Sequence, residues 1–286
     1  MAHKLCICNH KGGVGKTTTT INIAGSLSKN KGKKVLVVDC DKSGNLTDAL
    51  VDKSNTHTAH QEGHLDTWEQ AAFNLIKDMK RYISLGETEE SIIKNAILPT
   101  EYPRIDIIPI LSTSEATKQE NIIINTARDE EENCFSLYKK FLEDIEDEYD
   151  YILFDLAAGA EGLYCMNALL ATDYLLIPVN HDNDSVKGSI KIFEKMTNEI
   201  RSQNPKINIL GVFCNGYRDV SQWRQTLDDY EALPTNYQIP VKIRFSDGLA
   251  TAKNLRTPIC YHRSKSNGSE DFDQLAGYIM QKFGDK

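Results

Sequence analysis

The chain has 286 residues, 40% of them hydrophobic and 26% charged, which is enough for a packed core with a hydrophilic surface. A formal net charge of −8 excludes a strongly basic nucleic-acid-binding protein as a description of the whole chain, although a local basic patch stays open. The longest apolar runs, such as Tyr174–Val179, have the length of a strand, so we expect no transmembrane helix. Seven scattered cysteines without zinc-site spacing indicate a reduced, cytoplasmic protein.

Short apolar strands alternate with helical segments along the chain. We expect strands at residues 4–8, 35–38, 105–108, 151–154, 174–177, 207–213 and 239–243. Apolar residues at helical spacing predict a helix over about residues 16–29. The alternation predicts an α/β fold, a doubly wound and mostly parallel sheet with helices on both faces and ligands at the C-terminal ends of the strands. We expect one domain over residues 1–286, with residues 52–66 as a surface excursion.

A glycine-rich segment stands between the first strand and the first helix. Residues 11–18 read Lys-Gly-Gly-Val-Gly-Lys-Thr-Thr. The glycines let successive backbone N–H groups face an anion, and the helix N-terminus adds partial positive charge, which predicts a phosphate-binding P-loop. In such a loop Lys16 reaches the β- and γ-phosphates, Thr17 ligates Mg²⁺, and Thr18 hydrogen-bonds an inner phosphate. The predicted nucleotide-binding residues here are Gly12, Gly13, Val14, Gly15, Lys16, Thr17 and Thr18.

The same eight residues resemble the deviant Walker A motif of the ParA/MinD ATPases, in which an additional lysine precedes the glycines; Lys11 has that position. The resemblance implies a P-loop ATPase with ATP and Mg²⁺ as cofactors. It also implies a homodimer in which two ATP-bound subunits face each other and Lys11 reaches the partner's phosphates. A cation supplied in trans stabilises phosphoryl transfer only after pairing, so assembly and hydrolysis become coupled. Lys11 and Lys16 are therefore candidate catalytic residues.

Two acidic segments extend the resemblance. Residues 37–47 are similar to the family's strand ending in Asp-x-Asp-Pro-Gln-Gly-Asn. This implies that Asp41 orients the attacking water, as a third catalytic residue, and that Asp39 supports the water shell of Mg²⁺. Residues 149–155 resemble a Walker B strand that delivers Asp155 beside the metal through water.

Both acidic segments depart from the family's pattern. Lys42-Ser43 replaces Pro-Gln after the first, and Ala157-Ala158 replaces Pro-Pro after the second. Because proline restricts the backbone, we expect both loops to be more flexible than in the family.

The base pocket is expected near the last two strands. Asn215 resembles the family's adenine-reading asparagine, because its amide offers both a donor and an acceptor to the adenine edge; a capping asparagine is the alternative. Residues 239–244 resemble the segment beside the base, which assigns Pro240 and Val241 to the pocket wall.

The C-terminal half carries a local excess of positive charge, with six basic residues and one acidic residue between positions 241 and 265. Gathered on one face of a dimer, such residues bind DNA phosphates without reading bases; scattered solvated side chains are the alternative. The candidate DNA-binding residues are Arg201, Arg218, Arg224, Lys242, Arg244, Lys253 and Arg256.

These features resemble the short ParA-type partition ATPases that lack an N-terminal helix-turn-helix. The resemblance implies an ATP-dependent dimer that binds DNA non-specifically and acts in plasmid or chromosome segregation, associated with the nucleoid when ATP is bound. It also implies a ParB-like centromere-binding partner that stimulates hydrolysis.

A MinD-like positioning ATPase, whose ATP dimer binds a membrane or a protein partner, is the alternative. Phe272, Leu275, Ile279 and Phe283 recur at helical spacing near the C-terminus, but the flanking charges are mixed. Mixed charges favour a helix packed in the core, so we expect no membrane binding.

Two further readings are weaker. His57, His60 and His64 have the spacing to place three imidazoles on one helix face, but polar, turn-rich surroundings argue against a metal site there. A nitrogenase-like reductase needs cysteines at cluster spacing, and Cys165 has no such partner.

Overall fold

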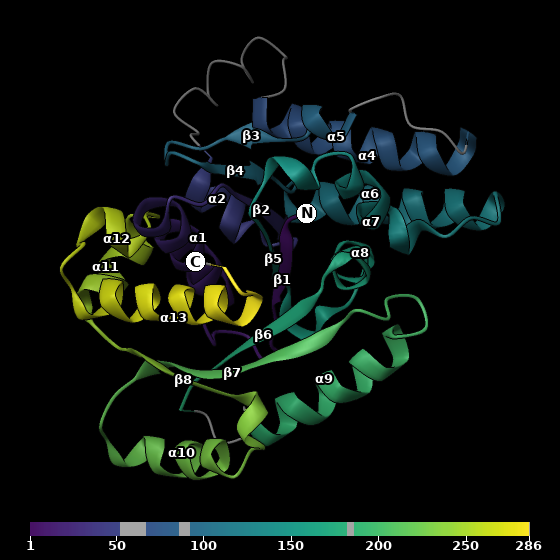
Figure 1. The fold of residues 1–286 in the computed structure, drawn as a ribbon. Helices are drawn as coiled ribbons and strands as arrows, with labels where there is room; N and C mark the ends of the chain where they lie inside the picture. The colour runs from purple at the N-terminus through teal and green to yellow at the C-terminus, as the bar shows by residue number, and fades with distance from the viewer. Residues whose placement is uncertain (52–66, 86–91, 182–185, 286) are drawn as a thin grey trace.

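A computed structural model describes residues 1–51, 67–85, 92–181 and 186–285. The predicted excursion at 52–66, with His57, His60 and His64, lies outside them. Within the described residues the chain forms an eight-stranded sheet in the order β3-β4-β2-β5-β1-β6-β7-β8 (Figure 1). The strands are β1 (His3–Ile7), β2 (Val35–Cys40), β3 (Leu98–Pro99), β4 (Ile105–Ile108), β5 (Tyr151–Leu156), β6 (Tyr174–Val179), β7 (Asn208–Tyr217) and β8 (Gln238–Arg244). All neighbours pair in parallel except β3 and β4, which confirms the predicted α/β fold.

Helices cover both faces of the sheet because each central strand is apolar on both sides. In β1, Leu5 and Ile7 join one core cluster, whereas Cys6 joins the other. The first face is covered by α1 (Lys16–Lys31), α2 (Asn45–Leu50), α11 (Asp247–Asn254), α12 (Ile259–His262) and α13 (Asn267–Phe283) (Figure 1). The second face is covered by α4 (Thr67–Leu85), α5 (Ile92–Asn95), α6 (Thr113–Asp129), α7 (Leu137–Glu143), α8 (Leu163–Ala171), α9 (Val186–Ile200) and α10 (Arg224–Glu231).

The C-terminal helix α13 packs into the core, as the mixed charges predicted. Phe272, Leu275 and Ile279 are fully buried against α1 and the sheet. Phe283 stacks on His3 with ring centroids 4.3 Å apart. Across the described residues, no helix combines the length and the apolar character needed to cross a membrane.

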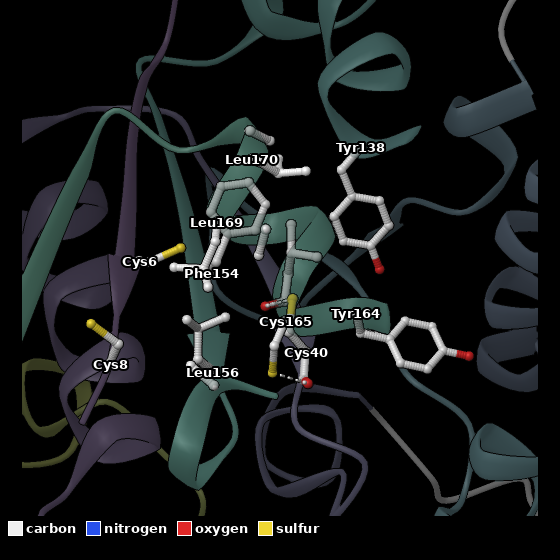
Figure 2. Packing of buried hydrophobic residues seen from close by; sticks show 14 of the residues in the cluster. Cys6, Cys8, Cys40, Tyr138, Phe154, Leu156, Tyr164, Cys165, Leu169 and Leu170 are labelled. Carbon is white, nitrogen blue, oxygen red and sulfur yellow. Dashed lines mark hydrogen bonds between the residues drawn. The ribbon is translucent and has the colours of Figure 1, made fainter. Parts of the chain in front are cut away.

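The cysteines behave as small apolar residues. All seven are buried, and none forms a disulfide. Figure 2 shows Cys6, Cys40 and Cys165 among the apolar side chains beside Phe154. Burial raises the pKa of the Cys165 thiol to about 12, so the thiol stays protonated at neutral pH.

Two elements differ from the sequence expectation. The antiparallel edge strand β3 has only two residues, too few for an alternation pattern to reveal. Strand β7 continues to Tyr217, beyond the predicted end at residue 213, with register shifts against β8 that keep the two strands paired. Asn215 therefore lies inside a strand.

Candidate functional site

A cavity of about 410 Å³ opens at the C-terminal ends of the central strands, between α1, α2 and the turn that joins α11 to α12. Its inner end is lined by residues of the predicted phosphate loop: Gly12, Gly13, Gly15, Lys16, Thr17 and Thr18. Asp41, after β2, and Ala158, after β5, also line it. The topology thus brings three loops from three neighbouring strands to one site, where a parallel sheet binds ligands.

Two asparagines hold the phosphate loop. Asn9 donates from Nδ2 to the Pro178 carbonyl oxygen at 2.8 Å and accepts the Lys11 N–H at 2.9 Å. Asn215 donates from Nδ2 to the Val14 carbonyl oxygen at 2.8 Å. Gly15 has φ 90°, and a Cβ there would lie 2.2 Å from Asn215 Nδ2, so glycine alone fits. These contacts anchor the loop to β6 and to β7.

Lys16 places a buried positive charge on this loop. The residue is 8% exposed, and its Nζ donates to the Lys11 carbonyl oxygen at 3.1 Å. Burial lowers the pKa of Lys16, and the negative charges of Asp155 and Asp41 oppose that shift. An anion in the glycine cradle would meet both the ammonium and the N-terminus of α1.

Asp155 and Asp39 lie opposite each other on β5 and β2 and are both buried. Burial and then the neighbouring Asp39 charge raise the pKa of Asp155 to about 8. The Oδ1 atom of Asp155 accepts from Thr20 Oγ1 at 3.3 Å, whereas its Oδ2 atom has no hydrogen-bond partner among the described residues. A buried carboxylate oxygen without a partner, close to the acidic side chains of Asp39 and Asp41, fits a divalent cation. The cation would offset the repulsion between these carboxylates.

Thr17, at the start of α1, lines the cavity and shares this corner with Asp155, whose pKa its hydroxyl lowers. In the described part of the chain, no three His, Cys, Asp or Glu side chains gather as a metal-binding group. The Thr17 hydroxyl and the Asp155 carboxylate therefore fit Mg²⁺, which takes few protein ligands and fills the remaining positions with water and phosphate oxygens.

Asp39 organises the loop after β2. Its Oδ1 accepts the Asp41 N–H at 3.1 Å, and its Oδ2 accepts the Thr47 N–H at 2.8 Å and the Thr47 hydroxyl at 2.7 Å. Burial raises the pKa of Asp39 to about 7, against the hydrogen bonds from Thr47. The side chain thereby presents Asp41 to the cavity, while Asp39 itself does not line it.

A family model described as an AAA domain matches residues 2–209. The chain belongs to this family. It is 26% identical to the chromosome partitioning protein ParA of Myxococcus xanthus, over 97% of this chain and 88% of the relative. It is 26% identical to the sporulation initiation inhibitor protein Soj of Bacillus subtilis, over 96% of this chain and 97% of the relative.

Among solved structures, the septum site-determining protein MinD of Pyrococcus horikoshii, complexed with Mg-ADP, has a similar fold. The TM-score is 0.70 at 20% identity, and the match covers 99% of this chain and 98% of that one. Together these similarities confirm the resemblance to the ParA/MinD ATPases that the phosphate loop indicated.

The outer end of the cavity in this ParA/MinD-family chain differs from the prediction. Asn215, Pro240 and Val241 do not line it. Both are residues of β8: the Pro240 side chain is exposed, and the Val241 side chain is buried in the core cluster that α1 and α13 cover. The Nδ2 donor of Asn215 is committed to Val14, which leaves the buried Oδ1 without a partner in the described chain. Beyond the bond to Val14, the amide of Asn215 thus retains its Oδ1 acceptor and the second hydrogen on Nδ2.

The outer wall is built instead from residues that the sequence analysis did not assign to it: Ile21, Asn22, Asp48, Ala49, Ala252, Arg256 and Thr257. Arg256, predicted as a DNA contact, has φ 56° and donates from a guanidinium N–H to the Asp48 carbonyl oxygen at 2.9 Å. The one local sign of a turn here is the proline two residues later, at Pro258. No phosphate or metal motif includes these positions.

The predicted DNA-binding residues do not form one surface. Arg201 lies within 3.4 Å of Asn208 at the start of β7, on the N-terminal side of the strands, whereas the cavity lies at their C-terminal ends. Arg244 is engaged by Asp271 of α13 at 2.6 Å. Arg224 begins α10, and the Lys253 side chain is not among those described. Sequence alone could not separate these residues, because the chain folds back between them.

Two of the predicted basic residues do lie together with aromatic rings. The Arg218 guanidinium stacks 3.5 Å from the ring centroid of Phe245, and Lys242 Nζ lies 5.0 Å from that of Tyr217. Phe245 is 43% exposed. These four residues, called here the β7–β8 end surface, stand where both strands end.

Proposed function

We propose that this chain is a Mg²⁺-dependent ATPase of the ParA type, in which two subunits pair face to face with ATP between them. The observation that carries the proposal is the inner end of the cavity. A glycine cradle and a buried ammonium on Lys16 line it, and Asp155, with an oxygen that lacks a partner in the described chain, lies buried behind them against Thr17 and Thr20 of α1. They supply the three groups that a magnesium triphosphate needs.

Each side chain has a separate task in this proposal. The loop N–H groups and Lys16 would bind the phosphates, and Thr17, Asp39 and Asp155 are the residues that would hold Mg²⁺, directly or through water. The metal would neutralise charge on the transferring phosphoryl group. Asp41, held by Asp39 at the cavity wall, orients the attacking water.

Lys11 and Asn215 complete the nucleotide contacts in the proposal. Lys11 is half-buried at the start of the loop, and we assign it to the phosphates of the partner subunit. Asn215 Oδ1 is buried outside the cavity lining, so in this proposal the amide turns toward the nucleotide for Oδ1 to accept the amino N–H of adenine. ATP would thus be needed to bring the two subunits together.

For the biological role we propose ATP-dependent, non-specific DNA binding in plasmid or chromosome segregation. Support comes from the relative named as a chromosome partitioning protein and from the β7–β8 end surface, where cations for phosphates stand beside an exposed ring. In this role a ParB-like partner stimulates hydrolysis and releases the DNA. The protein is then cytoplasmic and associated with the nucleoid while ATP is bound.

Filter binding of random-sequence duplex DNA with ATP, ADP or no nucleotide tests this role. We expect retention with ATP alone and a steep loss with added salt. The double variant Arg218→Ala/Lys242→Ala should weaken binding about tenfold, whereas Arg201→Ala, at the opposite ends of the strands, should bind as the unaltered chain does. DNA binding that ignores the nucleotide would reject the proposal.

The MinD-like alternative is an outcome of a parallel measurement. Sedimentation with anionic liposomes in the presence of ATP should leave the protein in the supernatant, because the apolar face of α13 is already buried in the core. Liposome binding without DNA retention would select the alternative.

A further inference from the structure

Glu120 of α6 connects the two loops that flank the inner end of the cavity. Its Oε2 atom lies 2.6 Å from Lys42 Nζ, directly after Asp41 in the loop that follows β2. Its Oε1 atom accepts the Leu163 N–H at 2.6 Å, where the loop that follows β5 ends and α8 begins. One carboxylate thus joins two segments that are 121 positions apart in the sequence.

The surroundings of Glu120 are built for this contact. The residue is 7% exposed, so its charge depends on protein partners rather than on water. Gly162 has φ 90°, and a Cβ there would lie 2.7 Å from Glu120 Oε1. On the other side, Thr113 of α6 donates from Oγ1 to the Lys42 carbonyl oxygen at 2.8 Å. Helix α6 therefore contacts both the backbone carbonyl and the side-chain ammonium of Lys42.

The contact also reaches the cavity from both sides. Asp41, next to Lys42, and Ala158, in the loop that ends at Gly162, both line the cavity. The N-terminus of α8 has no side-chain cap from its own N-cap residue, Gly162, and Glu120 supplies the acceptor from another helix. If either loop moves, the buried carboxylate loses a partner and the other loop is affected.

We propose that Glu120 is a positioning residue that couples the loop after β2 to the loop after β5, so that both take their nucleotide-bound arrangement together. This inference rests on the proposed ATPase function for its catalytic consequence. Lys42 stands where the family pattern has a proline, and its ion pair with Glu120 ties the loop that the missing proline leaves unrestrained. The expected loosening of this loop is thereby offset.

Three variants test the coupling: Lys42→Met, Glu120→Gln and the double variant. Glutamine keeps an acceptor for the Leu163 N–H, and methionine keeps the length of lysine. Lys118→Met, on the same helix in an exposed ion pair, is the matched control. Two readouts are needed: hydrogen exchange at the Leu163 amide without nucleotide, and kcat and KM for ATP hydrolysis by the folded protein.

We expect Lys42→Met to speed exchange at Leu163 about tenfold, although residue 163 is unchanged and lies in the other loop. We expect each single variant to lower kcat about tenfold with KM within about twofold, and the double variant to lose no more than either single one. Unchanged exchange at Leu163, or a double variant that loses about 100-fold, would overturn the coupling. If the unaltered chain hydrolyses no ATP but Lys42→Met still speeds exchange, the proposed function fails and the coupling stands.

Discussion

The two ends of the cavity are encoded in different ways. The inner end is mostly one continuous stretch, residues 12–18, fixed by local glycine geometry. The outer end is assembled from α1, α2, α11 and the turn before α12, with Ile21 and Thr257 lying 236 positions apart, and these segments meet only because the chain folds. In the proposed function, phosphate binding therefore depends on a local pattern, whereas any contacts to the rest of the nucleotide depend on tertiary packing.

The largest effect is expected for Lys11, whose proposed role is in the partner subunit. Lys11→Ala should lower kcat roughly 10³-fold, as loss of a cation supplied in trans does, while a single subunit still binds ATP. Sedimentation with a non-hydrolysable analogue should show monomers for the variant and dimers for the unaltered chain. Normal turnover in Lys11→Ala would remove the in-trans role.

Lys16→Ala should weaken ATP binding by about 100-fold or more, because charge-assisted hydrogen bonds to phosphate are lost from a buried site. Calorimetric titration with ATP checks this. Lys118→Ala, in which an exposed lysine is removed, should bind as before. Equal affinities for the two variants would mean that the glycine cradle alone binds the phosphates.

Asn215→Ala probes the boundary between the two ends. The lost bond to Val14 should weaken ATP and GTP alike, and the lost Oδ1 should in addition lower the preference for ATP over GTP about tenfold. Parallel titrations with both nucleotides give the ratio. An unchanged ratio would show that the amide acts only by holding the phosphate loop.

The smallest effect is expected at the outer wall. Arg256→Gly should change the free energy of unfolding by less than about 1 kcal/mol, because relief of the left-handed backbone offsets the lost bond to Asp48. ATP affinity should fall about threefold as the guanidinium leaves the cavity wall. Urea titration and ATP binding measure the two quantities. A tenfold loss of ATP affinity would show that the outer end contributes more to nucleotide binding than this comparison assigns to it.

The parts that could be predicted from sequence are those with a short repeat or a short motif. The apolar runs gave seven strands and the sheet type, and the glycines placed Lys16 and Thr17 on the cavity. Arg256 and Glu120 could not be identified from the sequence, because their hydrogen-bond partners, Asp48 and Lys42, lie 208 and 78 positions away. The basic residues of the C-terminal half were grouped by sequence proximity, but β7, β8 and α13 direct them to different surfaces.

Both margins of the described sheet are poor templates for another strand. At one margin, β3 has two residues and ends in Pro99; at the other, β8 exposes Pro240 and Lys242. A proline offers no N–H to an incoming chain, and a lysine would have to be desolvated there. Growth of the sheet from copy to copy is therefore disfavoured, which protects a concentrated solution of this protein from fibre-like association.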